Sequence, residues 1–267
     1  MRFTFVCVVG AMLAMSATAR AEDIQLYAAG SLRGAMTDIG KAFSAGAGVR
    51  VEGTFGPSGV LERKIAGGAK ADVFASANME YPRTLSRAGK SGPVFRFAGN
   101  KLCALVKPGI KVDSETLIDR MLDPSIKLGT STPNSDPSGD YAFEVFRKIG
   151  AIRPGAGAIL ERKALKLTGT ATSAIPPAGR SVYGWHIDEG RADIFLAYCT
   201  AAAEARKQYP EQQIVELPHA LAVGADYGLT VIKGAPSEAD RFAQFTLSSA
   251  GQSILIGYGF APGQTER

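Results

Sequence analysis

The feature that most constrains this fold is a strand, a tight turn and a helix that recur along the first third of the chain. Residues 23–29 predict a strand, and apolar side chains recur at helical spacing over residues 32–45. A second strand is expected at 49–55, a helix begins near residue 60, and residues 71–75 form a continuously apolar strand. Such a run is typical of a parallel strand that is covered on both faces. The pattern predicts an α/β domain with a mostly parallel sheet flanked by helices.

The same alternation restarts near residue 101 and continues almost to the C-terminus. Strands are expected at 101–106, 127–130, 193–198, 213–217 and 227–232, and helices at 116–122, 140–149, 238–247 and 250–258. A stretch rich in Thr, Ala and Pro between residues 167 and 179 is expected to be an exposed loop. The chain is therefore long enough, and patterned well enough, for two lobes.

The N-terminus has the pattern of a secretory signal peptide. Met1 and Arg2 give a basic start, an apolar run extends from Phe3 to about Ala17, and Ala19-Arg20-Ala21 matches a small-residue cleavage site. The apolar run is shorter than the roughly 20 residues of a transmembrane helix. We therefore expect residues 1–21 to be removed after Ala21, leaving an exported, periplasmic chain. The alternative is an uncleaved N-terminal anchor.

The charge balance gives little indication of a large charged partner. Without residues 1–21 the chain keeps 28 Lys and Arg against 25 Asp and Glu, a net charge of about +3. No dense basic run is interleaved with aromatic residues, so nucleic acid is not an expected partner. A mild positive charge favours the approach of anions.

Two cysteines, Cys103 and Cys199, remain after the signal peptide is removed. In an oxidising compartment they are candidates for a disulfide, and the alternative is two separate buried thiols. The two histidines, His186 and His219, are isolated from any acidic or cysteine cluster at ligand spacing, so no metal site is expected.

Three turns share one design, in which a serine beside a glycine follows a strand and opens a helix. They are Gly30-Ser31, Pro57-Ser58-Gly59 and Pro137-Ser138-Gly139. Each serine alone is explained as a helix N-cap. Helix N-termini also bind anions through unpaired N–H groups, and in open α/β sheets such turns meet at the carboxyl ends of the strands. Three of them together favour an anion site.

At the level of whole segments, the chain resembles the periplasmic molybdate-binding proteins of ABC transporters, which are type II periplasmic solute-binding proteins. The resemblance rests on LYAAGSL (26–32), FGPSG (55–59), GGAKADVFASA (67–77), DPSGDYAFEVFRKIGA (136–151) and ADIFLAY (192–198). It implies two α/β lobes with the ligand cleft between them. The lobes are expected at 22–100 with 226–267, and at 101–225.

The resemblance also implies a set of ligand-binding residues. In that family a dehydrated oxyanion is held by neutral donors, and the matching positions are Ser31 and Ser58 on the first lobe. On the second lobe they are the backbone N–H groups of Ser138 and Arg180 and the hydroxyl of Tyr198. The position of Arg180 is usually apolar in the family, and an arginine there adds a charged bidentate donor if its side chain enters the cleft.

The function implied is capture of molybdate or tungstate for an ABC transporter, with a membrane permease and its ATPase as partners. The oxyanion is the ligand, no metal ligands or cofactor are expected, and the chain is expected to be a monomer. Two alternatives stay open: a binding protein for another anion, such as sulfate, phosphate or an organic sulfonate, and a secreted hydrolase. The hydrolase is disfavoured because the turn around Ser58 lacks the second glycine of a G-x-S-x-G elbow.

Overall fold

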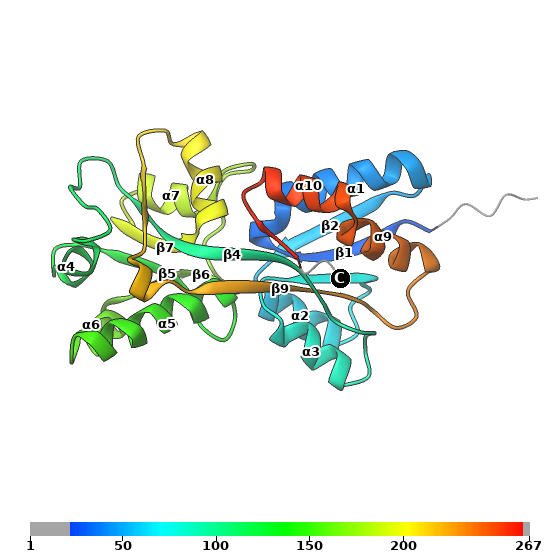
Figure 1. Cartoon of the computed structure of the whole chain (residues 1–267), viewed down its shortest axis with the longest axis horizontal. Coiled ribbons are helices and arrows are strands. Elements are labelled where there is room, and N and C mark those ends of the chain that lie inside the picture. The colour runs from blue at the N-terminus through cyan, green and yellow to red at the C-terminus, as the bar shows by residue number, and fades with distance from the viewer. Residues whose placement is uncertain (1–21, 264–267) are drawn as a thin grey trace, which may run out of the picture.

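The computed structural model describes residues 22–263 and shows two α/β lobes side by side (Figure 1). The expected signal peptide at residues 1–21 lies outside the described part of the chain. Two long strands, β4 (Phe95–Val106) and β9 (Gly224–Val231), run through both lobes as an antiparallel pair. The expected class of two lobes around a sheet flanked by helices is confirmed.

The sheet of lobe I is built around β1 (Ile24–Ala29). This strand pairs in parallel with β2 (Val51–Gly56) and with β3 (Val73–Ser76). The sheet becomes antiparallel where β3 meets β9, because β9 enters this lobe from the other one. Lobe I is thus parallel at its centre and antiparallel along the crossing strand.

Helices cover both faces of the sheet in lobe I (Figure 1). The helices of this lobe are α1 (Arg33–Ala47), α2 (Ser58–Ala66), α3 (Glu80–Arg87), α9 (Ser237–Leu247) and α10 (Ser249–Gly257). Helices α1, α9 and α10 lie on one face, where α1 buries Met36, Ile39 and Phe43 at helical spacing. Helices α2 and α3 lie on the other face.

Lobe II repeats the design with β5 (Leu128–Ser131) at its centre, paired in parallel with β6 (Leu165–Thr168) and β7 (Ile194–Tyr198). Its helices are α4 (Leu117–Leu122), α5 (Pro137–Ile152), α6 (Ala156–Lys163), α7 (Val182–Asp188) and α8 (Cys199–Gln208). Helices α5 and α6 lie on one face of the sheet, and α7 and α8 on the other (Figure 1). Shorter elements are β8 (Gln213–Glu216), β10 (Ala261–Pro262) and two 3-10 turns, η1 (Gly30–Leu32) and η2 (His219–Leu221).

Strand β4 changes partner along its length and carries one half of a disulfide. It pairs with β9 up to Lys101 and with β7 from Leu102 onward. Cys103 on this strand is bonded to Cys199, the first residue of α8, with Cα atoms 4.9 Å apart. The sequence prediction of this bridge is confirmed, and the bridge ties the crossing strand to the end of β7.

Several elements differ from the sequence expectation. Helices α3, α6, α7 and α8 were not expected, and β4 begins at Phe95 rather than at residue 101. Strand β6 takes the first residues of the loop expected from 167 to 179, whereas residues 171–179 of that loop are largely exposed. The missed helices have 10 residues or fewer, but length alone does not explain their omission, because α4, with 6 residues, was expected.

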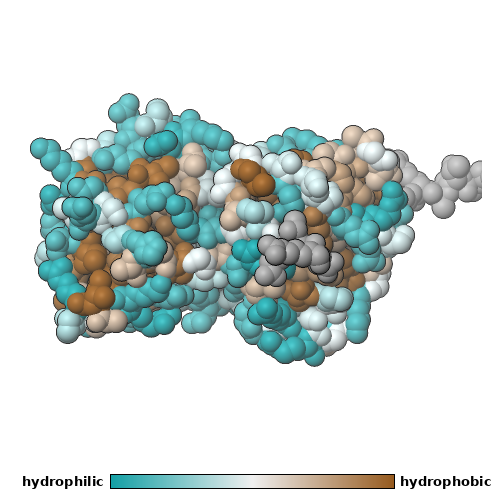
Figure 2. Space-filling view, viewed as in Figure 1, coloured by the Kyte–Doolittle hydropathy of each residue, from teal (hydrophilic) through white to brown (hydrophobic). Residues whose placement is uncertain are grey.

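The surface in view is mostly hydrophilic, with scattered apolar patches on both lobes (Figure 2). Over residues 22–263, no helix has both the length and the apolar character that crossing a bilayer requires.

Candidate functional site

The first serine turn contributes a hydroxyl that is already oriented. Ser31 lies in η1, directly after β1, and its Oγ is 2.9 Å from the hydroxyl of Tyr227 on β9. No side chain caps the turn, because its N-cap residue is Ala29. The N–H groups at this helix start are therefore not taken by a capping side chain.

The second turn has the same character. Ser58 is the first residue of α2 and is only 1% exposed, and its Oγ accepts a hydrogen bond from the Ala77 N–H at 3.1 Å. Its N-cap residue is Pro57, which also provides no side-chain cap. The Ala77 N–H at the end of β3 thus orients the Ser58 hydroxyl, and the positive dipole end of α2 lies beside it.

The third turn, on lobe II, is capped by an acid. Asp136 precedes α5, and its Oδ1 accepts a hydrogen bond from the Ser138 N–H at 3.2 Å. The Ser138 hydroxyl is fully buried and has no hydrogen-bond partner in the part of the chain that is described. Burial of the Asp136 carboxyl raises its pKa to about 6. The backbone donor expected to bind an anion is therefore shared with a carboxyl group of the same turn.

Tyr198 joins the two lobes. It ends β7 of lobe II, is 1% exposed, and its hydroxyl donates to the Ala77 carbonyl of lobe I at 3.4 Å. Its ring lies 5.6 Å from that of Tyr227 and 6.3 Å from that of Tyr141, measured between centroids. Because Ala77 also bonds Ser58, and Tyr227 also bonds Ser31, Tyr198 lies beside both serine turns of lobe I.

The lobes also meet through backbone groups at the start of α2. The Gly59 N–H donates to the Ser135 carbonyl at 3.0 Å, and Arg63 Nη2 donates to Ser135 Oγ at 3.4 Å. A Cβ atom on Gly59 would come within 2.8 Å of both the Ser135 carbonyl and the Tyr81 hydroxyl. A glycine is needed at position 59 for the two lobes to approach this closely.

The hydroxyl groups in this cleft are neutral donors. Burial raises the pKa of both Tyr198 and Tyr227 well above the usual value for tyrosine, so both keep their protons at neutral pH. Among residues 22–263 no group of three or more His, Cys, Asp and Glu side chains is placed to hold a metal ion. The protonated hydroxyls can donate hydrogen bonds to an anion.

Arg180 is not brought to the other four residues. Its guanidinium stacks on the ring of Tyr209, 4.5 Å from the centroid, and its Nε donates to the Tyr209 hydroxyl at 3.1 Å. Its backbone N–H donates to the Pro177 carbonyl at 3.0 Å, and the residue is exposed. A ligand contact of Arg180 stays a prediction, and the geometry gives it no support.

Sequence reasoning missed three residues of the cleft: Ala77, Asp136 and Tyr227. Asp136 had a visible signal, because an acid directly before Pro-Ser-Gly at a helix start is a strong N-cap. Tyr227 is 196 residues from Ser31, and no local pattern signals a contact over that separation.

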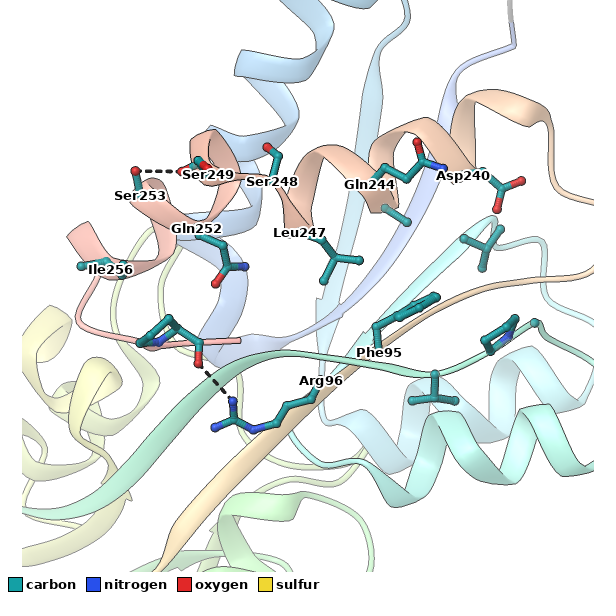
Figure 3. A pocket seen from close by; sticks show the side chains of 16 residues that line it. Phe95, Arg96, Asp240, Gln244, Leu247, Ser248, Ser249, Gln252, Ser253 and Ile256 are labelled. Carbon is teal, nitrogen blue, oxygen red and sulfur yellow. Dashed lines mark hydrogen bonds between the residues drawn. The ribbon is translucent and has the colours of Figure 1, made fainter. Parts of the chain in front are cut away.

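A separate groove of about 1100 Å³ lies on lobe I between the crossing strands and the helices α9 and α10 (Figure 3). None of the serines or tyrosines described above lines it. Its Arg96 already donates to Asp226 and to the Pro262 carbonyl, and Gln252 donates to the Phe97 carbonyl. With its main polar groups paired internally, this groove does not have the open donors of an anion site.

Comparison with known proteins gives a family and several relatives. A family model described as bacterial extracellular solute-binding protein matches residues 24–261. The chain is 33% identical over 241 residues to an uncharacterised protein of Pasteurella multocida, covering 90% of this chain and 98% of that protein. It is 28% identical over 249 residues to the molybdate-binding protein ModA of Mycobacterium tuberculosis, covering 91% of this chain and 86% of ModA.

Solved structures agree on the fold. The periplasmic molybdate-binding protein of Azotobacter vinelandii matches with a TM-score of 0.72 at 18% identity, over 91% of this chain and 100% of that one. The sulfate-binding protein SubI of Mycobacterium tuberculosis matches with a TM-score of 0.72 at 21% identity, over 91% and 87%. At these identities the likeness shows the fold alone.

Proposed function

Because this chain belongs to the family of bacterial extracellular solute-binding proteins, we propose that it captures molybdate or tungstate in the periplasm and delivers it to an ABC transporter. The observation that carries this proposal is that the Ser31, Ser58 and Tyr198 hydroxyls gather around Ala77 and Tyr227 where the two lobes meet. The turn that contains Ser138 reaches the same junction through Ser135, which accepts from the Gly59 N–H of α2. The end-to-end similarity to a protein named as molybdate-binding supports the choice of ligand.

Binding in such a cleft depends on replacing the hydration shell of the anion. The serine hydroxyls and open helix starts of lobe I give donors and positive dipole ends, and the Tyr198 hydroxyl turns from the Ala77 carbonyl to the ligand. Since both lobes contact the anion only when they are closed, the anion favours the closed form. The permease and its ATPase then act on that form.

Sulfate is the second candidate. It is supported by the fold likeness to SubI, whose TM-score equals that of the molybdate-binding structure. Sulfate and molybdate have the same charge and the same tetrahedral shape but differ in size. A site of neutral donors therefore discriminates between them by the distances at which its hydrogen bonds can form.

The test is calorimetric titration of the exported protein with molybdate, tungstate, sulfate, phosphate and an organic sulfonate. We expect molybdate and tungstate to bind most tightly. Each should also raise the melting temperature, since a ligand at about 100 times its Kd adds about 2.7 kcal/mol to the free energy of unfolding. Tighter binding of sulfate would move the assignment to the second candidate. No binding of any oxyanion, in protein with a cooperative melting transition, would refute the proposal.

A further inference from the structure

Three polar side chains from three separate elements form a chain of hydrogen bonds behind the anion cleft. Asn100 lies on β4, Tyr227 on β9 and Ser31 in η1. Asn100 Nδ2 is 3.2 Å from the Tyr227 hydroxyl, which is 2.9 Å from Ser31 Oγ. The two crossing strands are thereby connected to the first serine turn.

The orientation of the Asn100 amide gives this chain a direction. The Lys101 N–H donates to Asn100 Oδ1 at 2.9 Å, so the amide oxygen faces Lys101 and the amide nitrogen faces Tyr227 and the Thr200 hydroxyl. An amide NH₂ group can only donate hydrogen bonds. The oxygen of Tyr227 therefore accepts, and its own hydrogen must go elsewhere.

The hydrogen of the Tyr227 hydroxyl is directed to Ser31. Tyr227 is fully buried, and Ser31 Oγ is the acceptor that the described residues place within hydrogen-bond distance of this hydroxyl. With its oxygen accepting from Tyr227, Ser31 has its own hydrogen left to donate. Chains of this kind strengthen each successive bond, because every donor polarises the next.

We propose that Asn100 and Tyr227 are positioning residues that hold Ser31 as a hydrogen donor toward the bound oxyanion, so that the cleft prefers anions that carry no proton. The proposal rests on the function proposed above. Ser58 is treated in the same way by the Ala77 N–H, which donates to its Oγ and leaves its hydrogen to point outward. An anion such as hydrogen phosphate, which has a proton of its own to donate, then meets donors at Ser31 and Ser58 on the lobe I side, where it needs an acceptor.

The direct test is Asn100→Asp, which keeps the shape of the side chain and replaces its donor by an acceptor. Tyr227 then donates to residue 100, Ser31 donates to Tyr227, and a lone pair of Ser31 faces the ligand. We expect the ratio of molybdate affinity to hydrogen phosphate affinity to fall by at least about tenfold. The added charge repels both dianions alike, so the ratio reports the direction of the hydrogen bonds. The control is Thr200→Val, which removes the other acceptor of Asn100 and should leave the ratio unchanged.

Tyr227→Phe is the second variant, in case Asn100→Asp fails to fold. It removes the hydroxyl that relays the direction to Ser31, and the ratio of affinities should fall again, while a packing role alone would lower the melting temperature and weaken both anions equally. An unchanged ratio in both variants, measured on folded protein, would overturn the relay and leave the proposed function intact. Failure of the unmodified protein to bind molybdate would overturn both.

Discussion

The helix starts that face the anion site differ between the two lobes in how they are capped. On lobe I, the turns at Ser31 and Ser58 lack a capping side chain, and both hydroxyls are oriented by groups behind them. On lobe II, the start of α5 is capped by Asp136, and the hydroxyl of Ser138 has no partner among the described residues. The serine hydroxyls of lobe I are therefore already oriented as donors. The Ser138 N–H of lobe II, in contrast, must be shared with or released by the Asp136 carboxyl group.

The difference suggests an order of binding. Preorganised donors bind an anion without first breaking an internal bond, so the serine turns of lobe I are expected to make the first contact. Lobe II joins when the cleft closes over the anion, and its contribution depends on the charge of Asp136. The predictions below test this division of roles, from the largest expected effect to the smallest.

The strongest test replaces the lobe I serines. Ser31→Ala and Ser58→Ala should each weaken molybdate binding by roughly 1–3 kcal/mol, because a charged acceptor loses one buried hydrogen bond. Calorimetric titration measures the effect, and melting curves show that the protein is still folded. Ser253→Ala, at an exposed serine of α10 that is remote from these turns, is the matched control. If the two hydroxyls serve only their internal bonds to Tyr227 and Ala77, stability should fall by about 1 kcal/mol while the affinity stays at its original value.

The second test removes the acid of lobe II. Because the pKa of Asp136 is about 6, its carboxyl loses its charge as the pH falls through that value, and anion binding should tighten severalfold between about pH 8 and about pH 5. Asp136→Asn should bind as tightly at pH 8 as the unmodified protein does at pH 5, with a flat pH profile. The exposed Asp240→Asn changes the net charge equally and should keep the original profile. A pH profile that persists in Asp136→Asn would assign it to another group.

Arg180→Ala should change the affinity by well under tenfold, which means by much less than about 1.4 kcal/mol. The guanidinium lies on Tyr209, and removing it leaves the backbone in place. Arg191→Ala is a suitable control, because Arg191 stacks on Trp185 of the same lobe at 4.1 Å. A loss of a hundredfold or more only in Arg180→Ala would mean that this side chain enters the cleft on binding. The ligand would then be an anion with an additional carboxylate or phosphate-like face.

Ser138→Ala should have the smallest effect on binding. The change keeps the backbone N–H and removes a buried hydroxyl without a partner, so the affinity should stay within about threefold and the free energy of unfolding should not fall. Calorimetric titration with molybdate and melting curves of Ser138→Ala and Ser31→Ala compare the contributions of the two lobes to binding and stability. An equal loss of affinity in both variants would remove the distinction between them.

Much of the fold follows from local pattern. The apolar spacing of α1 and the continuously buried β3 are visible in the sequence, and the same periodicity located most strands of lobe II. The helices α6 and α7, which have 8 and 7 residues and hold about two turns each, were missed. The first half of β4 was missed because its pairing with β9 depends on residues more than 120 positions away.

The site divides in the same way. The serine turns were visible as Ser-Gly pairs at helix starts, and the family resemblance added Tyr198 as a candidate. The groups that orient them were not visible, since the bond from Tyr198 to Ala77 spans 121 positions and has no local signal. Arg180 shows the limit of transferring a position by alignment, because stacking on Tyr209 determines where this side chain lies.

The bridge between Cys103 and Cys199 sets a sequence of events for a chain that crosses a membrane from its N-terminus. The two cysteines are 96 positions apart, and β5, β6 and β7 all lie between them. With the export that we propose, Cys103 reaches the oxidising side before Cys199, so the bond closes only after these three strands have crossed the membrane. Closing a loop of that length removes about 4.7 kcal/mol of chain entropy from the unfolded state. The bond can therefore form only in a chain whose three parallel strands of lobe II are already present beside it, and it then stabilises the fold of the lobe that contains them.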